Sequence, residues 1–426
     1  MHELSPTTSV GVIGLGYVGL PLALTLSKHY SVRGYDLSQD RIDSLRLGKD
    51  HTGEVEDSDF ERNTKLYFTS ELEEMRGCDV HVVTVPTPID TTNNPDLSLL
   101  LLATKSVGRI LERGCVVIFE STVYPGVTEE ICIPELESES KLKVNRDFWV
   151  GYSPERINPG DRTHRLTDVV KVTAGSSEQC AEFVDRFYRS FVIAGTHMAP
   201  SIRVAEAAKV IENIQRDINI ALMNEFSQLF NKLDLDTADV LAAASTKWNF
   251  LPFKPGLVGG HCIGVDPYYL THKAREVGFD PEVILAGRKV NNAMPRFVAG
   301  RIHHLLELAG MNVDNASALV LGVTYKQNCP DTRNSKSIEL VRELRKTSMR
   351  VDVCDPIADT RQESFPCDIQ LNEWPLQGSY DVLILAVAHD AFISAPNKML
   401  QDCCSKNAVV YDITHKLPRI LITERL

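Results

Sequence analysis

The chain has 426 residues, of which 43% are hydrophobic and 24% charged, as in an ordinary folded protein of two or three domains. Its net charge of -12 argues against a nucleic acid or an anionic membrane as partner, because either needs a clustered basic surface. No apolar stretch approaches the ~18 to 20 residues of a membrane span, and no signal peptide is evident. The ten cysteines have neither CxxC nor zinc spacing. These features predict a cytoplasmic protein with reduced thiols and no metal site.

The first forty residues carry the clearest pattern. An apolar run at residues 10–13 predicts a buried strand, and Gly14-x-Gly16-x-x-Gly19 follows it directly. Residues 20–26 then read as a helix with a proline in its first turn, where proline is tolerated. This order of strand, glycine turn and helix is typical of a dinucleotide site, in which the glycines let the backbone approach a pyrophosphate. The alternative is an ordinary tight turn.

An acidic residue completes this pattern. Residues 31–35 predict a second strand that ends at Asp36, 17 residues after Gly19 and near the expected ~20. A carboxylate there accepts hydrogen bonds from the adenosine ribose and repels a 2'-phosphate, so NAD is favoured over NADP. The nearby Arg41 weakens that preference slightly.

Two further strands are predicted at residues 80–85 and 115–119. Polar residues follow each of them, including Thr87 and Thr122. In a parallel sheet these strand ends line the ligand crevice. The alternative is that both threonines cap turns.

The pattern changes at residues 201–233, which contain neither glycine nor proline and predict one long helix, able to join two domains or form a dimer core. A strand–helix alternation restarts near residue 317 and predicts a second parallel α/β domain. Its first turn, residues 322–333, has no glycine fingerprint. The elements expected after that turn are a helix at 335–346 and strands at 350–356, 381–387 and 408–412.

Four polar residues outside the fingerprint are candidates for chemistry. Lys209 and Asn213 share one face of the long helix, four residues apart. Glu155 follows a predicted strand. Asp266 precedes a proline, as at the start of a helix. Each has a plain alternative: a solvated lysine, a surface carboxylate, a helix cap.

Seven motifs, in this order, resemble those of the UDP-sugar 6-dehydrogenases, a family that includes UDP-glucose dehydrogenase and the UDP-N-acetylhexosamine dehydrogenases of bacterial surface polysaccharides. They are the glycine fingerprint, Pro86-Thr87-Pro88, Glu120-Ser121-Thr122, Ser153-Pro154-Glu155-Arg156, Ala208-Lys209-x-x-x-Asn213, Gly259-Gly260-His261-Cys262 and "KQNCPDTR" at residues 326–333. The resemblance covers nearly the whole chain.

The resemblance implies an α/β fold with two Rossmann-like, doubly wound parallel-sheet domains joined by a central long helix and a helical dimerisation domain. The NAD-binding domain would take residues 1–200, the central domain 201–300 and the UDP-binding domain 301–426. The expected partners are the UDP-sugar and a second copy in a homodimer.

The resemblance also gives Cys262 a chemical purpose. Oxidation of a primary alcohol to an acid removes two hydrides, and the intermediate aldehyde must gain a nucleophile before it can donate the second. A thiolate does this as a thiohemiacetal, whose oxidation leaves a thioester for water to cleave. Lys209 and Asn213 would stabilise the oxyanion, Asp266 would orient water or Lys209, and Glu155 would assist hydrolysis.

The remaining candidates are binding residues carried over by resemblance. Those expected to face NAD are Gly14, Gly16, Val18, Gly19, Asp36, Arg41, Thr87, Thr122 and Arg333. Those expected to face the UDP-sugar are Arg156, Ile157, Arg216, Gly259, His261, Tyr325 and Lys326.

Two departures from the UDP-glucose branch point to a UDP-N-acetylhexosamine. Pro159 stands where that branch has a second glutamate, and His261 where it has a serine; residues 247–274 are most similar to enzymes acting on UDP-N-acetylglucosamine or its galacto epimer. His261 as a mere loop residue is the alternative. The other functions considered are a two-electron hydroxyacid dehydrogenase, which needs no thiol, and a non-catalytic NAD-binding protein. An NAD-dependent epimerase is less favoured still.

Overall fold

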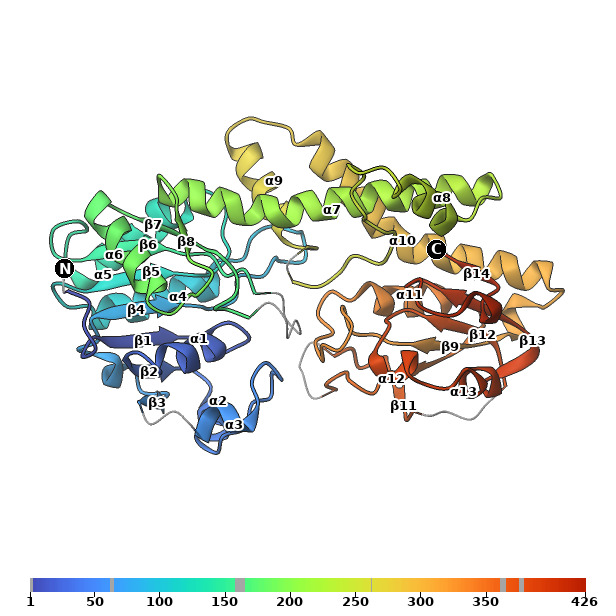
Figure 1. The fold of residues 1–426 in the computed structure, drawn as a ribbon, viewed down its shortest axis with the longest axis horizontal. Helices are drawn as coiled ribbons and strands as arrows, with labels where there is room; N and C mark the ends of the chain where they lie inside the picture. Colours follow the sequence, from blue (N-terminus) through green and yellow to red (C-terminus); the bar gives the residue numbers. More distant parts are fainter. Residues whose placement is uncertain (1–2, 62–64, 158–164, 262, 361–364, 375–378) are drawn as a thin grey trace. The chain divides into compact units, whose positions relative to one another are not determined.

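The computed structural model describes residues 3–61, 65–157, 165–261, 263–360, 365–374 and 379–426. The chain forms two compact units. The first comprises Met1–Glu212 and Tyr268–Phe279, and the second comprises Asn213–Pro267 and Asp280–Leu426. Each unit is built around one sheet (Figure 1). The predicted boundaries at residues 200 and 300 remain predictions.

The first unit contains an eight-stranded sheet in the order β3-β2-β1-β4-β5-β6-β7-β8. Its strands are β1 (Ser9–Ile13), β2 (Ser31–Tyr35), β3 (Leu66–Thr69), β4 (Val80–Val83), β5 (Val116–Phe119), β6 (Trp149–Tyr152), β7 (Lys171–Gly175) and β8 (Thr196–Met198). Its helices are α1 (Gly19–Leu26), α2 (Gln39–Arg46), α3 (Asp57–Glu61), α4 (Ser98–Ile110), α5 (Ile133–Ser140) and α6 (Glu178–Arg189).

This sheet differs from an all-parallel one at a single junction. Pairing is parallel from β3 to β6, antiparallel between β6 and β7, and parallel again between β7 and β8. The central strands β4 and β5 are buried at every position, as expected of parallel strands covered on both faces, and β5 is wholly apolar. The prediction of a doubly wound parallel sheet is therefore confirmed for this part, and β7 and β8 extend it.

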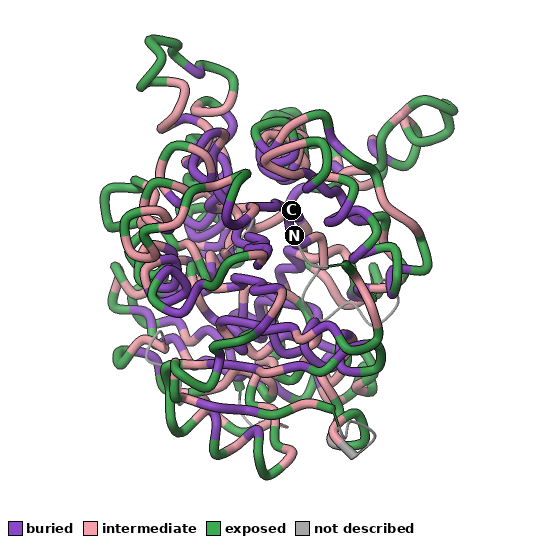
Figure 2. Tube along the Cα trace, turned by 90° about the vertical axis from the view of Figure 1, so that its left-hand side faces the viewer, coloured by how far each residue is buried: buried purple, intermediate pink, exposed green. Residues whose placement is uncertain are grey.

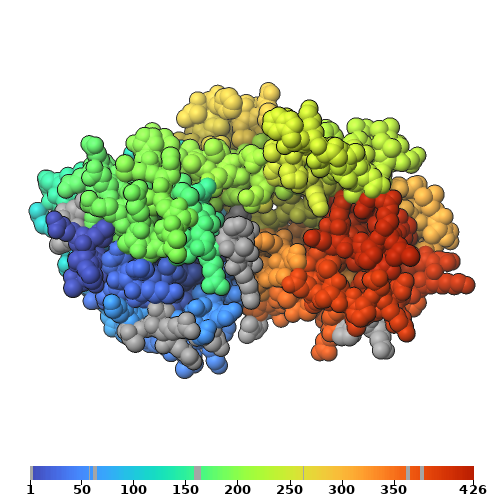
Figure 3. Space-filling model, viewed as in Figure 1, coloured from blue at the N-terminus to red at the C-terminus, as the bar shows by residue number. Residues whose placement is uncertain are grey.

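The second unit contains a wholly parallel six-stranded sheet in the order β11-β10-β9-β12-β13-β14. Its strands are β9 (Ser317–Leu321), β10 (Arg350–Cys354), β11 (Leu371–Asn372), β12 (Tyr380–Leu385), β13 (Cys404–Asp412) and β14 (Glu424–Arg425). The helices of this part are α11 (Lys336–Leu344), α12 (Asp390–Ile393) and α13 (Asn397–Asp402). In the space-filling view the residues from β9 onward form one contiguous block, coloured orange to red (Figure 3).

Four helices occupy the middle of the chain. They are α7 (Ile202–Lys232), α8 (Thr237–Ala244), α9 (Asp266–Glu276) and α10 (Glu282–Leu308). The single long helix expected at residues 201–233 is thus confirmed as α7. The 27-residue α10 was not predicted, because Pro295 lies inside it and reads as a helix breaker.

The hydrophobic core follows the two sheets, whose strands are mostly buried. Buried residues, drawn purple, gather in the interior, and exposed residues, drawn green, gather on the outer loops (Figure 2). In the first unit an aromatic group formed by Tyr30, Phe187, Tyr188 and Phe191 packs beside α1 and β2. All nine cysteines that the structure describes are free thiols.

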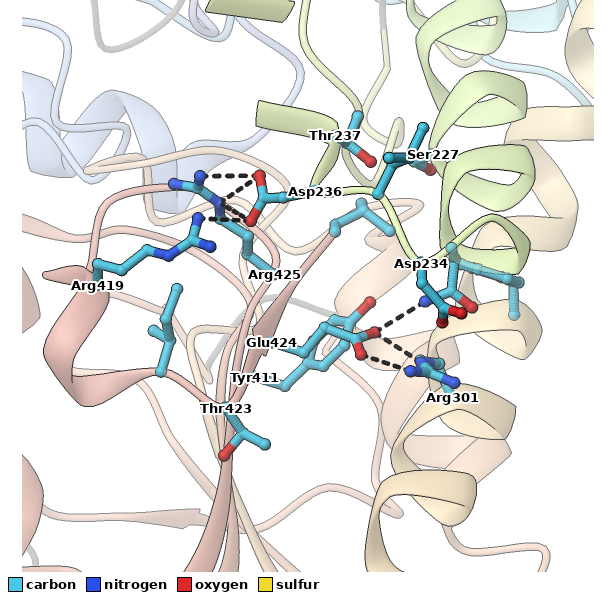
Figure 4. A pocket seen from close by; sticks show the side chains of 15 residues that line it. Ser227, Asp234, Asp236, Thr237, Arg301, Tyr411, Arg419, Thr423, Glu424 and Arg425 are labelled. Carbon is cyan, nitrogen blue, oxygen red and sulfur yellow. Dashed lines mark hydrogen bonds and ion pairs between the residues drawn. The ribbon is translucent and has the colours of Figure 1, made fainter. Parts of the chain in front are cut away.

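The end of the chain is fastened to the helices of the second unit (Figure 4). Strand β14 pairs with β13. Glu424 accepts two hydrogen bonds from Arg301 of α10, at 2.6 and 2.7 Å. Arg425 and Arg419 both pair with Asp236, the residue that caps α8. These ion pairs hold the last strand against α8 and α10.

Candidate functional site

The glycine turn in the first unit is shaped for close backbone approach. Gly14 has a φ of +91°, which favours glycine. A Cβ on Gly19 would lie 1.8 Å from the Gly14 carbonyl oxygen, so no side chain fits there. Gly16 has open space around it, and Val18 is the half-buried N-cap of α1. The close contact at Gly19 and the open space at Gly16 therefore agree with a glycine turn that packs tightly on its helix and leaves room for a pyrophosphate.

Asp36 lies at the end of β2, beside this turn. Its carboxylate accepts hydrogen bonds from the backbone N–H of Leu15 at 2.9 Å and of Ser38 at 3.0 Å. Arg41 turns inward: its guanidinium donates to the Leu15 carbonyl at 2.8 and 2.9 Å and pairs with Asp50 at 2.9 Å. Because this arginine is already engaged, it is poorly placed to attract a 2'-phosphate, which agrees with the preference for NAD.

The polar ends of β4 and β5 are tied to each other. The Thr87 hydroxyl donates to the Thr122 carbonyl at 2.6 Å, and Ser121 donates to the Val85 carbonyl at 2.6 Å. Tyr269 of α9 donates to the Thr87 carbonyl at 2.8 Å. The Thr87 hydroxyl thus serves the turn structure, as its alternative interpretation proposed, while both threonines stay half-buried at the carboxyl edge of the sheet.

Glu155 belongs to a buried charge cluster that sequence reasoning missed. The Lys171 ammonium lies 3.2 Å from Glu155 and 2.7 Å from Glu120, and all three side chains are at most 10% exposed. Tyr188 donates to Glu120 at 2.5 Å. A lone lysine at the start of the apolar strand "KVTAG" was the available signal, because an isolated buried lysine needs anionic partners.

The two glutamates of this cluster have pKa values shifted in opposite directions. Burial raises the pKa of Glu120 to about 7, although the Lys171 ammonium favours its ionised form. Burial opposes ionisation of Glu155 too, yet Lys171 and the backbone N–H of Ile157 hold the pKa of Glu155 below its ordinary value. Glu155 also accepts hydrogen bonds from the N–H groups of Arg156 and Ile157, at 2.7 and 2.5 Å. Its carboxylate therefore fixes the backbone of these two candidate substrate residues.

Arg156 is anchored on the same unit. Its guanidinium pairs with Glu212 of α7 at 2.7 Å and donates to the Val170 carbonyl at 2.6 Å, leaving the side chain 27% exposed. Ile157 packs against the hydrophobic core. Pro159 lies outside the described residues.

Lys209 is buried, with 8% exposure, which rules out the solvated lysine considered as its alternative. One turn earlier on α7, Glu206 accepts hydrogen bonds from the N–H groups of Gly126 and Thr128, at 2.6 and 3.0 Å. Burial raises the pKa of Glu206 to about 7, despite these two donors. Glu206 thereby joins the segment after Thr122 to the helix turn that carries Lys209.

In the second unit, Asn213 donates to the Asp266 carboxylate at 2.6 Å, and both side chains are buried. Asp266 is the first residue of α9, so it combines the helix-start position with a specific partner. Asn213 follows Lys209 by one turn of α7. Arg216 is exposed.

The Gly-Gly-His loop of the second unit packs on the first turn of the C-terminal sheet. A Cβ on Gly259 would lie 2.3 Å from the Asn334 carbonyl oxygen. Gly260 has a φ of +81° and lies against the Tyr325 ring. Both glycines are therefore required by close contact. Cys262 lies outside the described residues.

His261 has two polar neighbours on that turn. Its Nε2 lies 3.4 Å from the Tyr325 hydroxyl and 3.5 Å from the Asp331 carboxylate. Asp331 is fully buried and also binds the guanidinium of Arg333 through both oxygens. Lys326 is half-buried. Within the "KQNCPDTR" segment, the Asp331 carboxylate thus lies beside both His261 and Arg333. Sequence reasoning did not single out this residue.

Comparison with known proteins identifies the family. Residues 8–192, 203–293 and 319–419 match, in turn, the NAD binding, central and UDP binding domains of the UDP-glucose/GDP-mannose dehydrogenase family. The chain belongs to this family. It is an NAD-dependent UDP-sugar 6-dehydrogenase, and the predicted family, fold class, enzyme class and cofactor are confirmed.

Individual relatives are similar over their full length. The chain is 50% identical over 408 residues to a UDP-N-acetyl-D-glucosamine 6-dehydrogenase of Pseudomonas aeruginosa, covering 96% of this chain and 97% of the relative. It is 48% identical over 409 residues to a protein of the same name from Salmonella typhi, covering 96% of both chains. The structure of a UDP-D-ManNAc dehydrogenase from Pyrococcus horikoshii superposes with a TM-score of 0.86 at 31% identity, covering 97% of this chain and 96% of the other.

The described ranges contain neither a candidate membrane span nor a candidate metal centre. No described helix is both long and apolar enough to cross a membrane. Within the same ranges, no group of three or more His, Cys, Asp or Glu side chains is arranged to hold a metal ion.

Proposed function

We propose that this UDP-sugar 6-dehydrogenase oxidises C6 of a UDP-N-acetylhexosamine, UDP-N-acetylglucosamine or UDP-N-acetylgalactosamine, to the uronic acid for surface polysaccharide synthesis. The observation that carries the proposal is the 48–50% identity, over nearly the whole chain, to two proteins named UDP-N-acetyl-D-glucosamine 6-dehydrogenase. A similarly close relative from Staphylococcus aureus, 48% identical over 408 residues, is named Protein CapL.

In the proposed reaction the Cys262 thiol is the nucleophile. The C6 alcohol loses a hydride and a proton to give the aldehyde, and the thiol adds to it as a thiohemiacetal. Loss of a second hydride and proton leaves a thioester, which water cleaves to the acid and the free thiol. NAD, when bound, accepts the hydrides, so each sugar yields two NADH.

Lys209 and Asn213 are proposed to stabilise the oxyanion at C6. The bond from Asn213 to Asp266 fixes the orientation of this amide, since its Nδ2 is the donor to that carboxylate. Asp266 would thus position Asn213 as well as orient water or Lys209. Glu155 is proposed to assist hydrolysis of the thioester. It is also proposed to position Arg156 and Ile157, because its carboxylate accepts hydrogen bonds from their backbone N–H groups.

The substrate preference is proposed to depend on His261. Tyr325 and Asp331 hold its ring, leaving it as a fixed polar group rather than a freely rotating one. A site built to hydrogen-bond a substituent discriminates strongly against a sugar that lacks it, because its polar groups then go unpaired.

The decisive experiment compares kcat/KM for UDP-N-acetylglucosamine, UDP-N-acetylgalactosamine and UDP-glucose, followed by NADH formation. We expect at least one acetamido sugar to exceed UDP-glucose by 10-fold or more. A UDP-glucose value equal to or above both would refute the substrate proposal while leaving the dehydrogenase chemistry intact.

The thiol route has a separate test. Wild-type enzyme should form two NADH per sugar, and Cys262→Ser should lose steady-state acid production while NAD still binds. The matched control is Cys367→Ser, because Cys367 is an exposed thiol outside the motifs. Near-normal acid production by the Cys262 variant would exclude the covalent route.

A homodimer in the cytoplasm completes the proposal. Helix α7 leaves Leu222 and Leu229 45% and 50% exposed, an apolar pair suited to burial against a second copy. Light scattering should give a dimer mass for the wild type and a monomer for Leu222→Glu combined with Leu229→Glu. A monomeric wild type would contradict it. The disulfide-free state of the described cysteines suits the reducing cytoplasm.

A further inference from the structure

A chain of buried polar side chains runs between α7 and α10 and ends on the loop that precedes Gly259. Arg288 of α10 donates to the Asp217 carboxylate of α7 at 2.7 Å. Asn291 of α10 donates to the same carboxylate at 2.7 Å and to the Asp217 carbonyl at 3.0 Å. Asn224 of α7 donates to the Asn291 side-chain oxygen at 2.8 Å. Asn224 is fully buried, as are Asp217 and Asn291.

Asn224 then binds both backbone polar groups of one loop residue, Gly256. Its Oδ1 accepts from the Gly256 N–H at 2.8 Å, and its Nδ2 donates to the Gly256 carbonyl at 3.0 Å. This is the pairing that a neighbouring β-strand would give, supplied instead by one amide side chain. Gly256 is half-buried, so these two bonds pair backbone groups that water reaches only in part.

The donors and acceptors of this chain allow one arrangement. An ionised Asp217 accepts only, so Asn291 must present its NH2 group to Asp217 and its oxygen to Asn224. Asn224 must then present its NH2 group to Asn291, which leaves its oxygen for the Gly256 N–H. The ion pair of Asp217 and Arg288 at one end therefore fixes the orientation of both amides. In that orientation Asn224 presents an acceptor to the Gly256 N–H and a donor to the Gly256 carbonyl.

We propose that Asn224 is a positioning residue for the oxidation, because it fixes the start of the loop that carries Gly259, His261 and the Cys262 thiol. The far part of this loop is held separately, where Gly259 and Gly260 pack against Asn334 and Tyr325. With both points fixed, the six residues from Gly256 to His261 have little freedom. This inference rests on the proposed role of the loop in the reaction.

The test compares two asparagines of α7. Asn224→Ala removes both hydrogen bonds to the backbone of Gly256. Asn219→Ala is the matched control, because among the described residues Asn219 donates to the Gln215 carbonyl of its own helix and not to the loop. With the UDP-sugar that the wild type oxidises best, we expect kcat to fall at least 10-fold in the first variant and less than 2-fold in the second. The NAD dissociation constant should stay within 2-fold of wild type in both.

Hydrogen exchange separates positioning from general destabilisation. Peptides covering residues 254–261 should exchange at least 10-fold faster in Asn224→Ala, while α10 peptides keep their protection. If Asn224→Ala does not fold, Asn224→Asp is used, since it has the same shape, can still accept from the Gly256 N–H and loses both donations. We expect the same direction of change in kcat and in exchange.

The proposal would be overturned if a folded Asn224 variant, however lowered in melting temperature, kept wild-type kcat and wild-type exchange at residues 254–261. Failure of the substrate proposal would be visible in the wild type itself, as a preference for UDP-glucose. Failure of this inference appears only in the ratio of variant to wild type, so the two results are distinguishable.

Discussion

Gly19 lies so close to Gly14 that a methyl group on Gly19 would come within 1.8 Å of the Gly14 carbonyl oxygen. Gly16, between them in sequence, has nothing within 4 Å of the corresponding position. The same fingerprint therefore contains one glycine, Gly19, that the fold requires, and one, Gly16, that the fold leaves open and that we expect a bound dinucleotide to require.

Alanine substitutions should separate these two requirements. Gly16→Ala should keep the wild-type melting temperature and lose at least 10-fold in NAD affinity, because its methyl group enters the space meant for the pyrophosphate. Gly19→Ala should lower both, since α1 must shift to relieve the clash. Calorimetric titration measures the NAD affinity of both variants, and thermal unfolding measures their melting temperatures. Unchanged NAD affinity in Gly16→Ala would mean that the pyrophosphate binds elsewhere.

Removal of the Lys171 ammonium should be among the most damaging single substitutions in the first unit. Lys171→Met leaves Glu120 and Glu155 buried without their cation, and loss of one partner from a buried ion pair costs about 3–5 kcal/mol. Lys143→Met is the control, because Lys143 is 60% exposed and its pair with Glu137 is expected to contribute below about 1 kcal/mol. Urea unfolding measures how much unfolding free energy each variant loses relative to wild type. Equal losses in the two variants would contradict the prediction.

Glu206 should make stability depend on pH. Burial raises its pKa in the folded state from an ordinary 4.5 to about 7, so the folded chain binds this proton more tightly than the unfolded chain. The resulting stability is fully present below pH 4.5, falls as pH rises to about 7 and is absent above that.

The substitution Glu206→Gln removes this proton. Its destabilisation relative to wild type should consequently be larger at pH 5 than at pH 8, by up to about 3 kcal/mol. Unfolding measured at both pH values in both proteins cancels contributions from other groups such as Glu120. A difference of the opposite sign would show that Glu206 is ionised in the fold at neutral pH.

The ion pair between Arg301 and Glu424 should couple the last strand to α10. It is bidentate, and its side chains are 19% and 20% exposed. A double-mutant cycle with Arg301→Met and Glu424→Gln should give a coupling free energy of about 1–3 kcal/mol. A value near zero would mean that β14 is held by its backbone pairing alone.

The predictable part of the fold is the part in which local pattern and tertiary environment agree. Strand β5 is a continuous apolar run, and β1 and β9 are apolar after a first serine, which is how parallel strands buried on both faces read. The helix α7 has no breaker. The glycine fingerprint was legible because its physical requirement, close backbone approach, acts within six residues. The family, enzyme class and cofactor were predictable through motifs spread over the chain, which no composition or periodicity yields.

The parts that escaped prediction depend on distant partners. Lys171 looks like a strand residue until Glu120 and Glu155 are brought beside it. Asn224 is one polar residue of a long helix until the peptide of Gly256, 32 residues later, lies against it. In α10, the proline that predicts a break is accommodated because tertiary packing outweighs local propensity. Such pairings are absent from any short window of sequence.

The fastened end of the chain has a practical consequence for anyone who immobilises or purifies this enzyme. Leu426 is 2% exposed, and the two residues before it carry ion pairs to Arg301 and Asp236. An affinity tag fused after Leu426 would have to leave from a buried position and would strain β14, whereas Glu3, near the start, is exposed. Tags and surface linkers therefore belong at the amino terminus.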